Sequence, residues 1–503
     1  MKILHLSAEC HPAAKVGGLA DVVGALPRYQ REEGVEASVI MPCYQTPWLR
    51  DRAAAARTVC EGVIPAEEGR KTGLEGTERG EQVPARPFRV LQIEEPGLGF
   101  DLYAVELEGL FEGEGIYPGP GDPARGVPGE AGHFIAFQRA VLDWVWEERP
   151  GFNLLHCHDH HTALVPFMTS RCPRYGDLAQ MPTVLTVHNA QYQGRYDWEK
   201  TALLPDFDPS DSGLLEWGDT LNSLAAGLKC CWHITTVSPT YLQELGRRSA
   251  GLERLFRIER DKSTGILNGI DTREWDPSAD PHIHYNYDSG DLENGKERNK
   301  AFLLRQTGLP QADAGRVPLI SFIGRLVGEK GADLLPDLFA DLLDREVPVR
   351  FLLLGTGDPA LHERFRAMSR WYGEQGSFSA VIDYNEALAH QIYAGSDFLL
   401  MPSRVEPCGL NQLYAMRYGT LPVVRSTGGL RDTVTDHSEE GGCGIVFEEF
   451  TLEAAAEALD RAVALYSEAG RMGELRRRVM KKDYSWNASA IAYIELYERM
   501  TGK

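Results

Sequence analysis

The sequence predicts an α/β protein built from two doubly wound domains with a cleft between them. At 503 residues, the chain is longer than one hydrophobic core usually serves. Short apolar runs alternate with segments long enough for helices, a pattern typical of buried parallel strands in βαβ units. The clearest runs are KILHLSAE, ASVIMP, NLLHCHD, TVLTVHN, HITTVS, PLISFIG, VRFLLLG, DFLLMPS and LPVVRS.

The same design occurs twice along the chain. Residues 2–9 and 318–325 each begin a series of such units, and each is followed by a glycine-bearing loop and a helical pattern. Turn residues and Pro277 interrupt the pattern at residues 267–277, where we place the join between the domains. Two stretches of the region from about 61 to 130 are rich in glycine and charge, so we expect exposed loops there: EEGRKTGLEGTERGEQ and FEGEGIYPGPGDPARGVPGEAG.

Composition and charge limit the possible partners and cellular locations of the protein. The formal net charge of −21 argues against nucleic acid or an anionic membrane as a partner. No run of about 18 apolar residues predicts a membrane span, and the short apolar start lacks the features of a signal peptide. Nine cysteines without a regular spacing indicate reduced thiols and a cytoplasmic location.

The first motif that carries chemistry is KVGGLADVVGALP at residues 15–27, between a predicted strand and a predicted helix. Gly17 and Gly18 permit close approach of the backbone, and the helix N-terminus offers N–H groups to a phosphate. Lys15 adds a positive charge. The pattern is not a GxGxxG fingerprint, so a tight turn with a solvated lysine stays an alternative.

The second motif is GRLVGEKG at residues 324–331. Arg325 and Lys330 follow a predicted strand, and the carboxyl ends of parallel strands face the crevice where ligands bind. Two fixed cations there could neutralise a leaving diphosphate. The alternative is a pair of ordinary surface cations in a loop.

The third motif is SRVEPCGLNQLYAMRYGTLPVVRSTGGL at residues 403–430. Glu406 lies in a strand-to-helix loop, where a carboxylate could orient sugar hydroxyls or simply interact with the helix macrodipole. The small residues at 426–429 precede another helix and form a second candidate phosphate cradle.

In this order and spacing, the three motifs resemble those of bacterial glycogen synthases and plant starch synthases, the retaining GT-B transferases of glycosyltransferase family 5. The resemblance covers nearly the whole chain, through HCHDHHTALVP, TVHNAQYQG, WHITTVSPTY, GILNGID and LLGTGDP. It implies a GT-B fold of two Rossmann-like domains facing a central cleft. Residues 1–270 would form the acceptor-side domain, residues 271–484 the donor domain, and residues 485–503 a helix returning to the first domain.

The resemblance also assigns roles to matching residues of the first half. His188 resembles the histidine beside the transferred glucose, whose backbone carbonyl stabilises the cationic anomeric carbon. Asp159 resembles the aspartate of an HDWH-type motif, although His160 stands where the family has tryptophan, which leaves the local packing open. The residues that would contact the donor from this half are Lys15, Gly18, Asp21 and Asn268.

In the second half, Arg325 and Lys330 resemble the pair that binds the diphosphate, and Glu406 the carboxylate that holds glucose hydroxyls. Together with His188 and Asp159, these three form the expected catalytic set. Tyr384 stands where the family stacks a ring on the base. The other residues expected to line the donor pocket are Cys408, Thr427, Gly428, Gly429 and Leu430. The segment near 95–130 lacks the RPGLY-like turn of many bacterial members, so glucan recognition is less defined than donor recognition.

The resemblance implies transfer of glucose from ADP-glucose to the non-reducing 4-hydroxyl of an α-1,4-glucan such as glycogen, with retention and without a cofactor. Adjacent residues of HCHDHH point to opposite faces of a strand, so we expect no metal site there. Two alternatives remain, a UDP-glucose-dependent GT-B transferase and a catalytically inert glucan-binding homologue. The intact site residues argue against inertness. The oligomeric state stays open.

Overall fold

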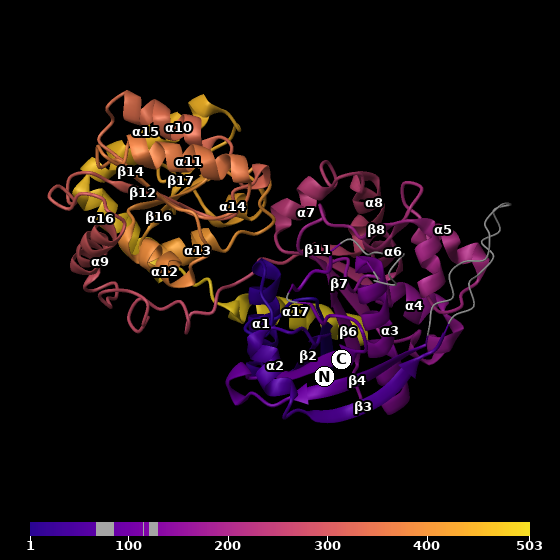
Figure 1. Ribbon diagram of the computed structural model, residues 1–503. Helices are drawn as coiled ribbons and strands as arrows, with labels where there is room; N and C mark the ends of the chain where they lie inside the picture. Colours follow the sequence, from indigo (N-terminus) through magenta and orange to yellow (C-terminus); the bar gives the residue numbers. More distant parts are fainter. Residues whose placement is uncertain (67–84, 114, 120–128, 503) are drawn as a thin grey trace. The chain divides into compact units, whose positions relative to one another are not determined.

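The computed structural model describes residues 1–66, 85–113, 115–119 and 129–502 (Figure 1). The chain forms two compact units. The N-terminal unit comprises Met1–Val237, Leu242–Asn268 and Trp486–Lys503, and the C-terminal unit comprises Ser238–Tyr241 and Gly269–Ser485. Each unit contains a large, mainly parallel sheet covered by helices. None of the helices in the described part of the chain is both long and apolar enough to cross a lipid bilayer.

The sheet of the N-terminal unit has nine strands in the order β11-β10-β7-β6-β1-β2-β5-β4-β3. The strands from β11 to β5 are parallel, whereas β4 runs antiparallel to β5 and β3. Their bounds are β1 (Lys2–Leu6), β2 (Glu36–Pro42), β3 (Arg57–Ile64), β4 (Arg86–Ile93), β5 (Asp101–Leu107), β6 (Leu154–His158), β7 (Thr183–Val187), β10 (His233–Thr236) and β11 (Ser263–Gly265).

Helices cover both faces of this sheet. Val184 of β7 packs in a cluster with Leu26 of α1 (Gly18–Glu32) and Trp486 of α17 (Trp486–Thr501). Its neighbour Leu185 points to the opposite face, against Gly227 of α6. The remaining helices and short strands are α2 (Pro47–Ala53), α3 (Glu130–Glu148), α4 (Val165–Arg171), α5 (Ser212–Leu215), α6 (Ser223–Cys230), α7 (Pro239–Leu245), α8 (Glu253–Ile258), β8 (Arg195–Tyr196) and β9 (Leu221–Asn222).

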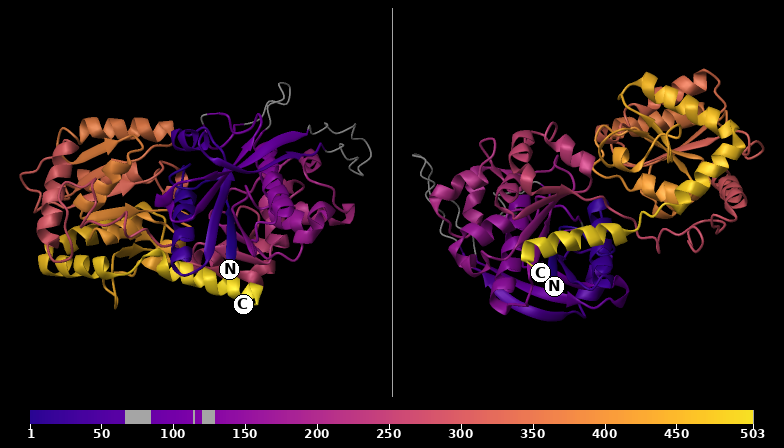
Figure 2. Two further views of the ribbon diagram at one scale, coloured as in Figure 1. Left: turned by 90° about the horizontal axis from the view of Figure 1, so that it is seen from below. Right: turned by 180° about the vertical axis from the view of Figure 1, so that it is seen from behind.

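The last helix, α17, belongs to the N-terminal unit although it follows the whole C-terminal unit in sequence. It packs along α1, and the two chain ends lie close together (Figure 2). Trp486, Tyr493 and Tyr497 are almost completely buried in the cluster that they share with α1. Burial of three large aromatic rings contributes several kcal/mol, on the order of 1.5–3 kcal/mol for each side chain. Removal of α17 would therefore expose this face of the sheet.

The sheet of the C-terminal unit has six parallel strands in the order β14-β13-β12-β15-β16-β17. They are β12 (Leu319–Ile323), β13 (Arg350–Leu354), β14 (Phe378–Val381), β15 (Phe398–Met401), β16 (Leu421–Arg425) and β17 (Ile445–Phe447). The helices are α9 (Leu292–Gln306), α10 (Leu335–Asp344), α11 (Pro359–Trp371), α12 (Glu386–Gly395), α13 (Asn411–Arg417), α14 (Gly428–Thr433), α15 (Leu452–Ser467) and α16 (Ala469–Lys481). Leu319 packs with α9 and α12, whereas Phe351 stacks on Phe339 of α10, so helices again cover both faces.

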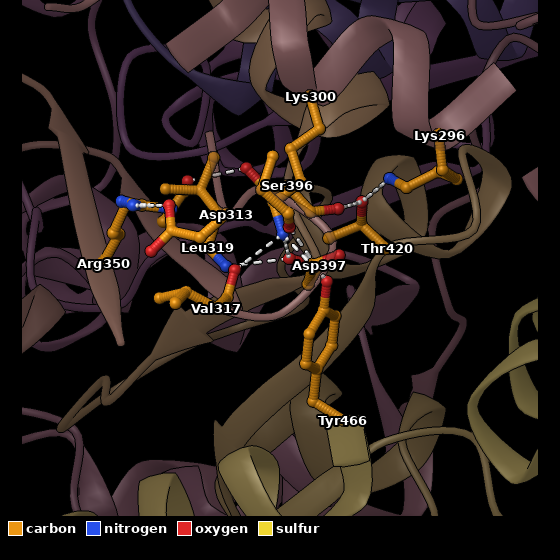
Figure 3. A network of polar contacts seen from close by, with 12 residues as sticks. Lys296, Lys300, Asp313, Val317, Leu319, Arg350, Ser396, Asp397, Thr420 and Tyr466 are labelled. Carbon is orange, nitrogen blue, oxygen red and sulfur yellow. Dashed lines mark hydrogen bonds and ion pairs between the residues drawn. The ribbon is translucent and has the colours of Figure 1, made fainter. Parts of the chain in front are cut away.

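A buried ionic network ties helices to the amino ends of these strands (Figure 3). Asp397, just before β15, accepts hydrogen bonds from Lys300 of α9 and Arg476 of α16, both at 2.5 Å. Lys300 also donates to the carbonyl of Val317, and the amide of Leu319 donates to Asp397. Burial alone would raise the pKa of Asp397, but the attraction of both cations and the hydrogen bonds hold it below its usual value. The network lies opposite the carboxyl ends and is structural.

All the strands that the apolar runs predict are present. The region from 61 to 130 also contains strands that the sequence did not predict, namely β4, β5 and the second half of β3. The glycine-rich stretch 67–82 lies outside the described residues. The second stretch, 111–132, is not simply exposed: Phe111 is buried, and α3 already begins at Glu130.

Candidate active site

The predicted site residues follow the carboxyl ends of strands in both units. In the N-terminal unit, Lys15 follows β1, Asp159 follows β6, His188 follows β7 and Asn268 follows β11. In the C-terminal unit the order is equally regular: Arg325 and Lys330 follow β12, Tyr384 follows β14, Glu406 and Cys408 follow β15, and Thr427–Leu430 follow β16. Loops at the carboxyl edge of a parallel sheet are where α/β proteins bind ligands.

The glycine loop after β1 is closed by a carboxylate. Glu9 accepts hydrogen bonds from the amides of Val16 at 2.6 Å and Gly17 at 3.0 Å, and from the hydroxyl of Tyr117. Burial raises the pKa of Glu9 by more than these hydrogen bonds lower it. An internal carboxylate therefore already binds the amides of Val16 and Gly17, directly before the helix N-terminus at Gly18 to which the sequence assigns phosphate binding.

Helix α1 begins at Gly18, directly after this loop. Lys15 forms an ion pair with Asp21 in the first turn of the helix, with Nζ 2.9 Å from Oδ1. Both side chains are about a quarter exposed, at 23% and 25%. Three of the predicted donor residues of this half, Lys15, Gly18 and Asp21, thus lie together at the start of α1, and the lysine remains accessible to an incoming anion.

Asp159 and His188 also meet. Oδ1 of Asp159 accepts a hydrogen bond from the backbone amide of His188 at 2.7 Å. Asp159 has φ +54°, in the left-handed region that aspartate tolerates better than most residues. The imidazole of His188 is held separately, with Nε2 3.0 Å from Nδ1 of His158. Burial lowers the pKa of His188, which keeps its ring neutral near pH 7.

Asn268, at the end of the N-terminal unit, has an unsatisfied polar atom. Its side chain is only 7% exposed, and Oδ1 has no hydrogen-bond partner within the described chain. A buried amide oxygen without a partner costs about 1–3 kcal/mol. A ligand hydroxyl would satisfy it, which fits the role that the sequence predicts.

The centre of the C-terminal cluster is an ion pair between Lys330 and Glu406. The ammonium Nζ lies 2.7 Å from both carboxylate oxygens, and Ser403 donates a third hydrogen bond to Oε2 at 2.9 Å. The Glu406 side chain is 5% exposed and that of Lys330 26%. Gly331, in the left-handed region, lies so close to the carbonyl of Pro402 that a Cβ would approach it to 2.2 Å. This close contact brings the β12 and β15 loops together.

Small residues allow the β16 loop to lie directly on the β15 loop. A Cβ on Gly428, which has φ +46°, would lie 1.9 Å from the carbonyl oxygen of Glu406. A Cβ on Gly429 would lie 2.1 Å from the carbonyl oxygen of Cys408. The amide of Gly429 donates to the Glu406 carbonyl at 3.1 Å. Three further predicted residues of these two segments are also buried, namely Cys408, Thr427 and Leu430. Only glycine fits at these two positions.

Two of the predicted site residues are more exposed to solvent. Arg325 is half exposed, and its Nη2 lies 3.5 Å from Glu329. Tyr384 is 66% exposed in the loop before α12. An exposed aromatic ring at the carboxyl edge of a sheet is accessible to a stacking base.

Several residues of these clusters were not among the predicted ones. Glu9, Tyr117, His158 and Ser403 all bond to predicted residues or to their loops. Glu9 carried a signal, because it is the last residue of the predicted run KILHLSAE at residues 2–9. Tyr117 carried none: it reaches Glu9 across 108 positions and stacks on His161, with ring centroids 5.1 Å apart. Tyr117 belongs to the 95–130 segment that lacks the family's RPGLY-like turn, so part of this segment lies against the glycine loop.

Among the described residues, two groups of three side chains are close enough to hold a metal ion. In the first, His5, His156 and His158, the ring nitrogens already bond to one another or to neighbouring polar groups. The second centres on the Glu130 carboxylate, which lies 2.8 Å from His160 and 3.7 Å from His161. Hydrogen bonds account for every ring nitrogen of the first group. In the second group, Nε2 of His160 is hydrogen-bonded to Glu130, whereas Nδ1 of His160 and Nδ1 of His161 have no hydrogen-bond partner within the described residues.

Comparisons with known proteins agree with this geometry. The profile of the family described as the starch synthase catalytic domain matches residues 2–258, and that of glycosyl transferases group 1 matches residues 311–482. The glycogen synthase of Flavobacterium johnsoniae is 43% identical over 498 residues, with 99% of this chain and 98% of that protein covered. Glycogen synthase 2 of Geobacter sulfurreducens is 39% identical over 511 residues, with 99% and 98% covered.

Among solved structures, the chain is similar to the catalytic domain of starch synthase IV from Arabidopsis thaliana, which was solved with ADP and acarbose. The TM-score is 0.83 at 30% sequence identity, over 100% of this chain and 99% of that one. Both sheets, the order of the site loops and the full-length similarity point the same way. The chain belongs to the glycogen and starch synthase family, glucosyltransferases of the GT-B fold.

Proposed function

We propose that the chain extends an α-1,4-glucan by transferring glucose from ADP-glucose to the non-reducing 4-hydroxyl, with retention at the anomeric carbon. The observation that carries this proposal is the partly buried Lys330–Glu406 pair at the carboxyl edge of the C-terminal sheet. It joins a cation suited to a leaving phosphate to a carboxylate suited to sugar hydroxyls in one rigid group. Family membership supports glucosyl transfer as the reaction.

The chemistry follows from where charge develops. As the nucleoside diphosphate leaves, negative charge grows on its phosphates, and we assign Lys15, Arg325 and Lys330 to that charge. Positive charge grows at the anomeric carbon, where the carbonyl of His188 would stabilise it. The acceptor 4-hydroxyl would attack on the face from which the diphosphate leaves, and the departing phosphate would take its proton. This route needs no dedicated general base on the protein.

ADP is the proposed nucleotide because the similar starch synthase structure contains ADP. Tyr384, with its exposed ring at the end of β14, is the proposed platform for the base. The acceptor is proposed to be glycogen, since relatives that match the full chain are glycogen synthases. We also propose a cytoplasmic location, which is where the nine cysteines would stay reduced.

A donor competition assay tests the proposal. The purified chain is mixed with glycogen and either ADP-glucose or UDP-glucose, and release of ADP or UDP is followed over time. We expect ADP-glucose to be used at least tenfold faster than UDP-glucose. When the glucose of the donor is labelled, the label should enter the glycogen. β-Amylase, which removes maltose from α-1,4-linked non-reducing ends, should then release that label. Faster use of UDP-glucose would overturn the donor assignment. Nucleotide release from neither would support an inert glucan-binding protein. Glu406→Gln is the matched control for contaminating activity.

A further inference from the structure

A continuous hydrogen-bonded network runs from His188 through the interior of the N-terminal unit to the C-terminal helix α17. Nε2 of His188 lies 3.0 Å from Nδ1 of His158, and Nε2 of His158 lies 3.1 Å from Nδ1 of His5. Nε2 of His5 lies 2.8 Å from Oε1 of Gln30 on α1. Gln30 in turn donates from Nε2 to the hydroxyl of Tyr497 on α17 at 3.1 Å. All members except His188 are fully or almost fully buried.

A second branch continues from the same tyrosine. The hydroxyl of Tyr497 lies 2.7 Å from Nδ1 of His156, whose Nε2 lies 2.6 Å from the hydroxyl of Thr186. Thr186 ends the branch on the hydroxyl of Thr235, at 2.5 Å. Tyr497 therefore has both a donor and an acceptor, as a buried hydroxyl requires.

The sheet brings these side chains together by register and alternation. His5 of β1 pairs with His156 of β6, and Thr186 of β7 pairs with His158 of β6 and with Thr235 of β10. Residues two apart on one strand share a face, so His156 and His158 both point toward α1 and α17. Four neighbouring parallel strands thus form one polar row beneath two helices.

The bonding pattern fixes which nitrogen of each ring carries the proton. The carbonyl oxygen of Gln30 can only accept, so Nε2 of His5 must donate to it. In a neutral imidazole the other nitrogen then accepts, so Nε2 of His158 must donate to Nδ1 of His5. By the same step, Nε2 of His188 must donate to Nδ1 of His158. Nδ1 of His188 is left without a proton.

These proton positions require neutral imidazole rings, and the surroundings keep the rings neutral. Burial lowers the pKa of His5 to about 4, and it lowers the pKa values of His156 and His158 well below their usual range, with further lowering from neighbouring histidines. The rings of His156 and His158 are stacked with centroids 4.3 Å apart. A proton on one would place its charge beside the other without solvent, so all three stay neutral near pH 7.

We propose that His158, His5, Gln30 and Tyr497 are positioning residues that hold His188 in one ring orientation and one tautomer. This places an acceptor nitrogen, Nδ1, where a substrate hydroxyl can donate to it. Within the described residues, Nδ1 of His188 has no hydrogen-bond partner, whereas its amide and Nε2 are both bonded. The catalytic consequence rests on the proposed function, but the tautomer itself does not.

The direct test uses the unmodified, unliganded protein. With ¹⁵N-labelled histidine, two-bond ¹H–¹⁵N correlation spectra distinguish a protonated from an unprotonated ring nitrogen. Signals of His5, His158 and His188 are assigned by their loss in single His→Gln variants. We expect each ring at pH 7 to be a single tautomer with the proton on Nε2. A proton on Nδ1 of His188, or a rapidly averaged mixture, would overturn the proposal.

A variant series tests the consequence for catalysis. Gln30→Met removes both polar atoms at nearly constant volume, so the His188 signals should average and kcat should fall about tenfold, with the donor KM changed less than twofold. Gln30→Glu keeps the acceptor oxygen for His5 and should restore both the single tautomer and most of the kcat. Thr235→Val, at the end of the other branch, should change neither. Equal kcat in all three variants would overturn the positioning role. If the wild-type protein uses no nucleotide sugar, the proposed function fails while the spectra still decide the tautomer.

Discussion

Removal of either partner of the Lys330–Glu406 pair should damage both stability and catalysis. The change is the set Lys330→Ala, Glu406→Ala and the double variant. In the native structure, one ammonium contacts both carboxylate oxygens at 2.7 Å, and the carboxylate is only 5% exposed. The loop position of these residues alone would suggest little effect on folding, but the burial of Glu406 predicts otherwise.

The magnitude follows from that burial. Loss of one partner costs about 3–5 kcal/mol for a fully buried ion pair and about 0.2–1 kcal/mol for an exposed one. Lys330 is 26% exposed, so water can reach the pair from one side. We therefore expect Lys330→Ala to lower the free energy of unfolding by about 1–3 kcal/mol. In that variant, Ser403 remains as the one side-chain donor in the described chain that bonds to the Glu406 carboxylate. The double variant should lose less than the sum of the single variants, because it leaves no uncompensated charge.

Catalysis should fall further than stability. Loss of one preorganised electrostatic contact to the transition state typically costs about a hundredfold or more in kcat, or about 2.7–4 kcal/mol. ADP release from ADP-glucose and glycogen measures kcat, and urea unfolding under identical conditions measures stability. Arg345→Ala, which breaks a solvent-exposed pair with Asp460 in the same unit, is the control and should leave kcat unchanged. Near-wild-type kcat in either single variant, or strictly additive unfolding energies, would refute the reasoning.

Three further predictions concern single residues. Gly428→Ala should weaken ADP binding at least tenfold by isothermal titration calorimetry, because its Cβ would clash with backbone. Gly441→Ala, which shares a positive φ but has open space around it, should leave binding intact. Asp159→Asn, which keeps an acceptor oxygen and tolerates the left-handed region, should retain at least tenfold more kcat than Asp159→Ala. Asp397→Asn should lower the urea midpoint at pH 7. The pKa of Asp397 is lower in the folded state than in the unfolded state, where it is about 4. The contribution of Asp397 to the free energy of unfolding is therefore complete above about pH 4 and is lost as the pH falls toward the folded-state pKa. The urea midpoints of the two proteins should then converge in acid.

The sequence predicts the buried strands well because burial on both faces leaves an unmistakable apolar run. KILHL and RFLLL are examples, and both form central strands, β1 and β13. The strands β3, β4 and β5 were missed because polar or charged residues are mixed with apolar ones in each of them, as in the Arg89–Glu106 pair between β4 and β5. Alternation of charged and apolar residues beside a glycine-rich stretch resembles a loop in composition.

Site residues that directly follow a strand could be predicted from the sequence, whereas the contacts between them could not. Lys330 and Glu406 could be predicted because each follows the end of a strand, and parallel strands bring their carboxyl ends to one edge of the sheet. The contact between them depends on Gly331 fitting against the carbonyl of Pro402, which no local pattern reveals. Glu9, which binds the glycine loop, also accepts a hydrogen bond from Tyr117, a residue from a distant segment of the sequence. Long-range polar pairing leaves no periodic signal in the sequence.

The left-handed turn at Asp159 has a structural reason that also explains how His188 is held. The amide of Asp159 donates to the carbonyl of Thr186, as in a regular parallel ladder. In the next rung, the amide of His188 would normally donate to the carbonyl of Asp159. With φ +54°, that carbonyl turns instead into the following loop, where the amide and hydroxyl of Thr162 bond to it. The carboxylate of Asp159 takes over the vacated place and accepts the His188 amide at 2.7 Å. A charged acceptor thus replaces a neutral one at the end of β7, while the preceding residue, His158, holds the ring. The last residue of β6, His158, and the residue that follows it, Asp159, therefore fix the side chain and the backbone of His188, and the shape of one turn makes this possible.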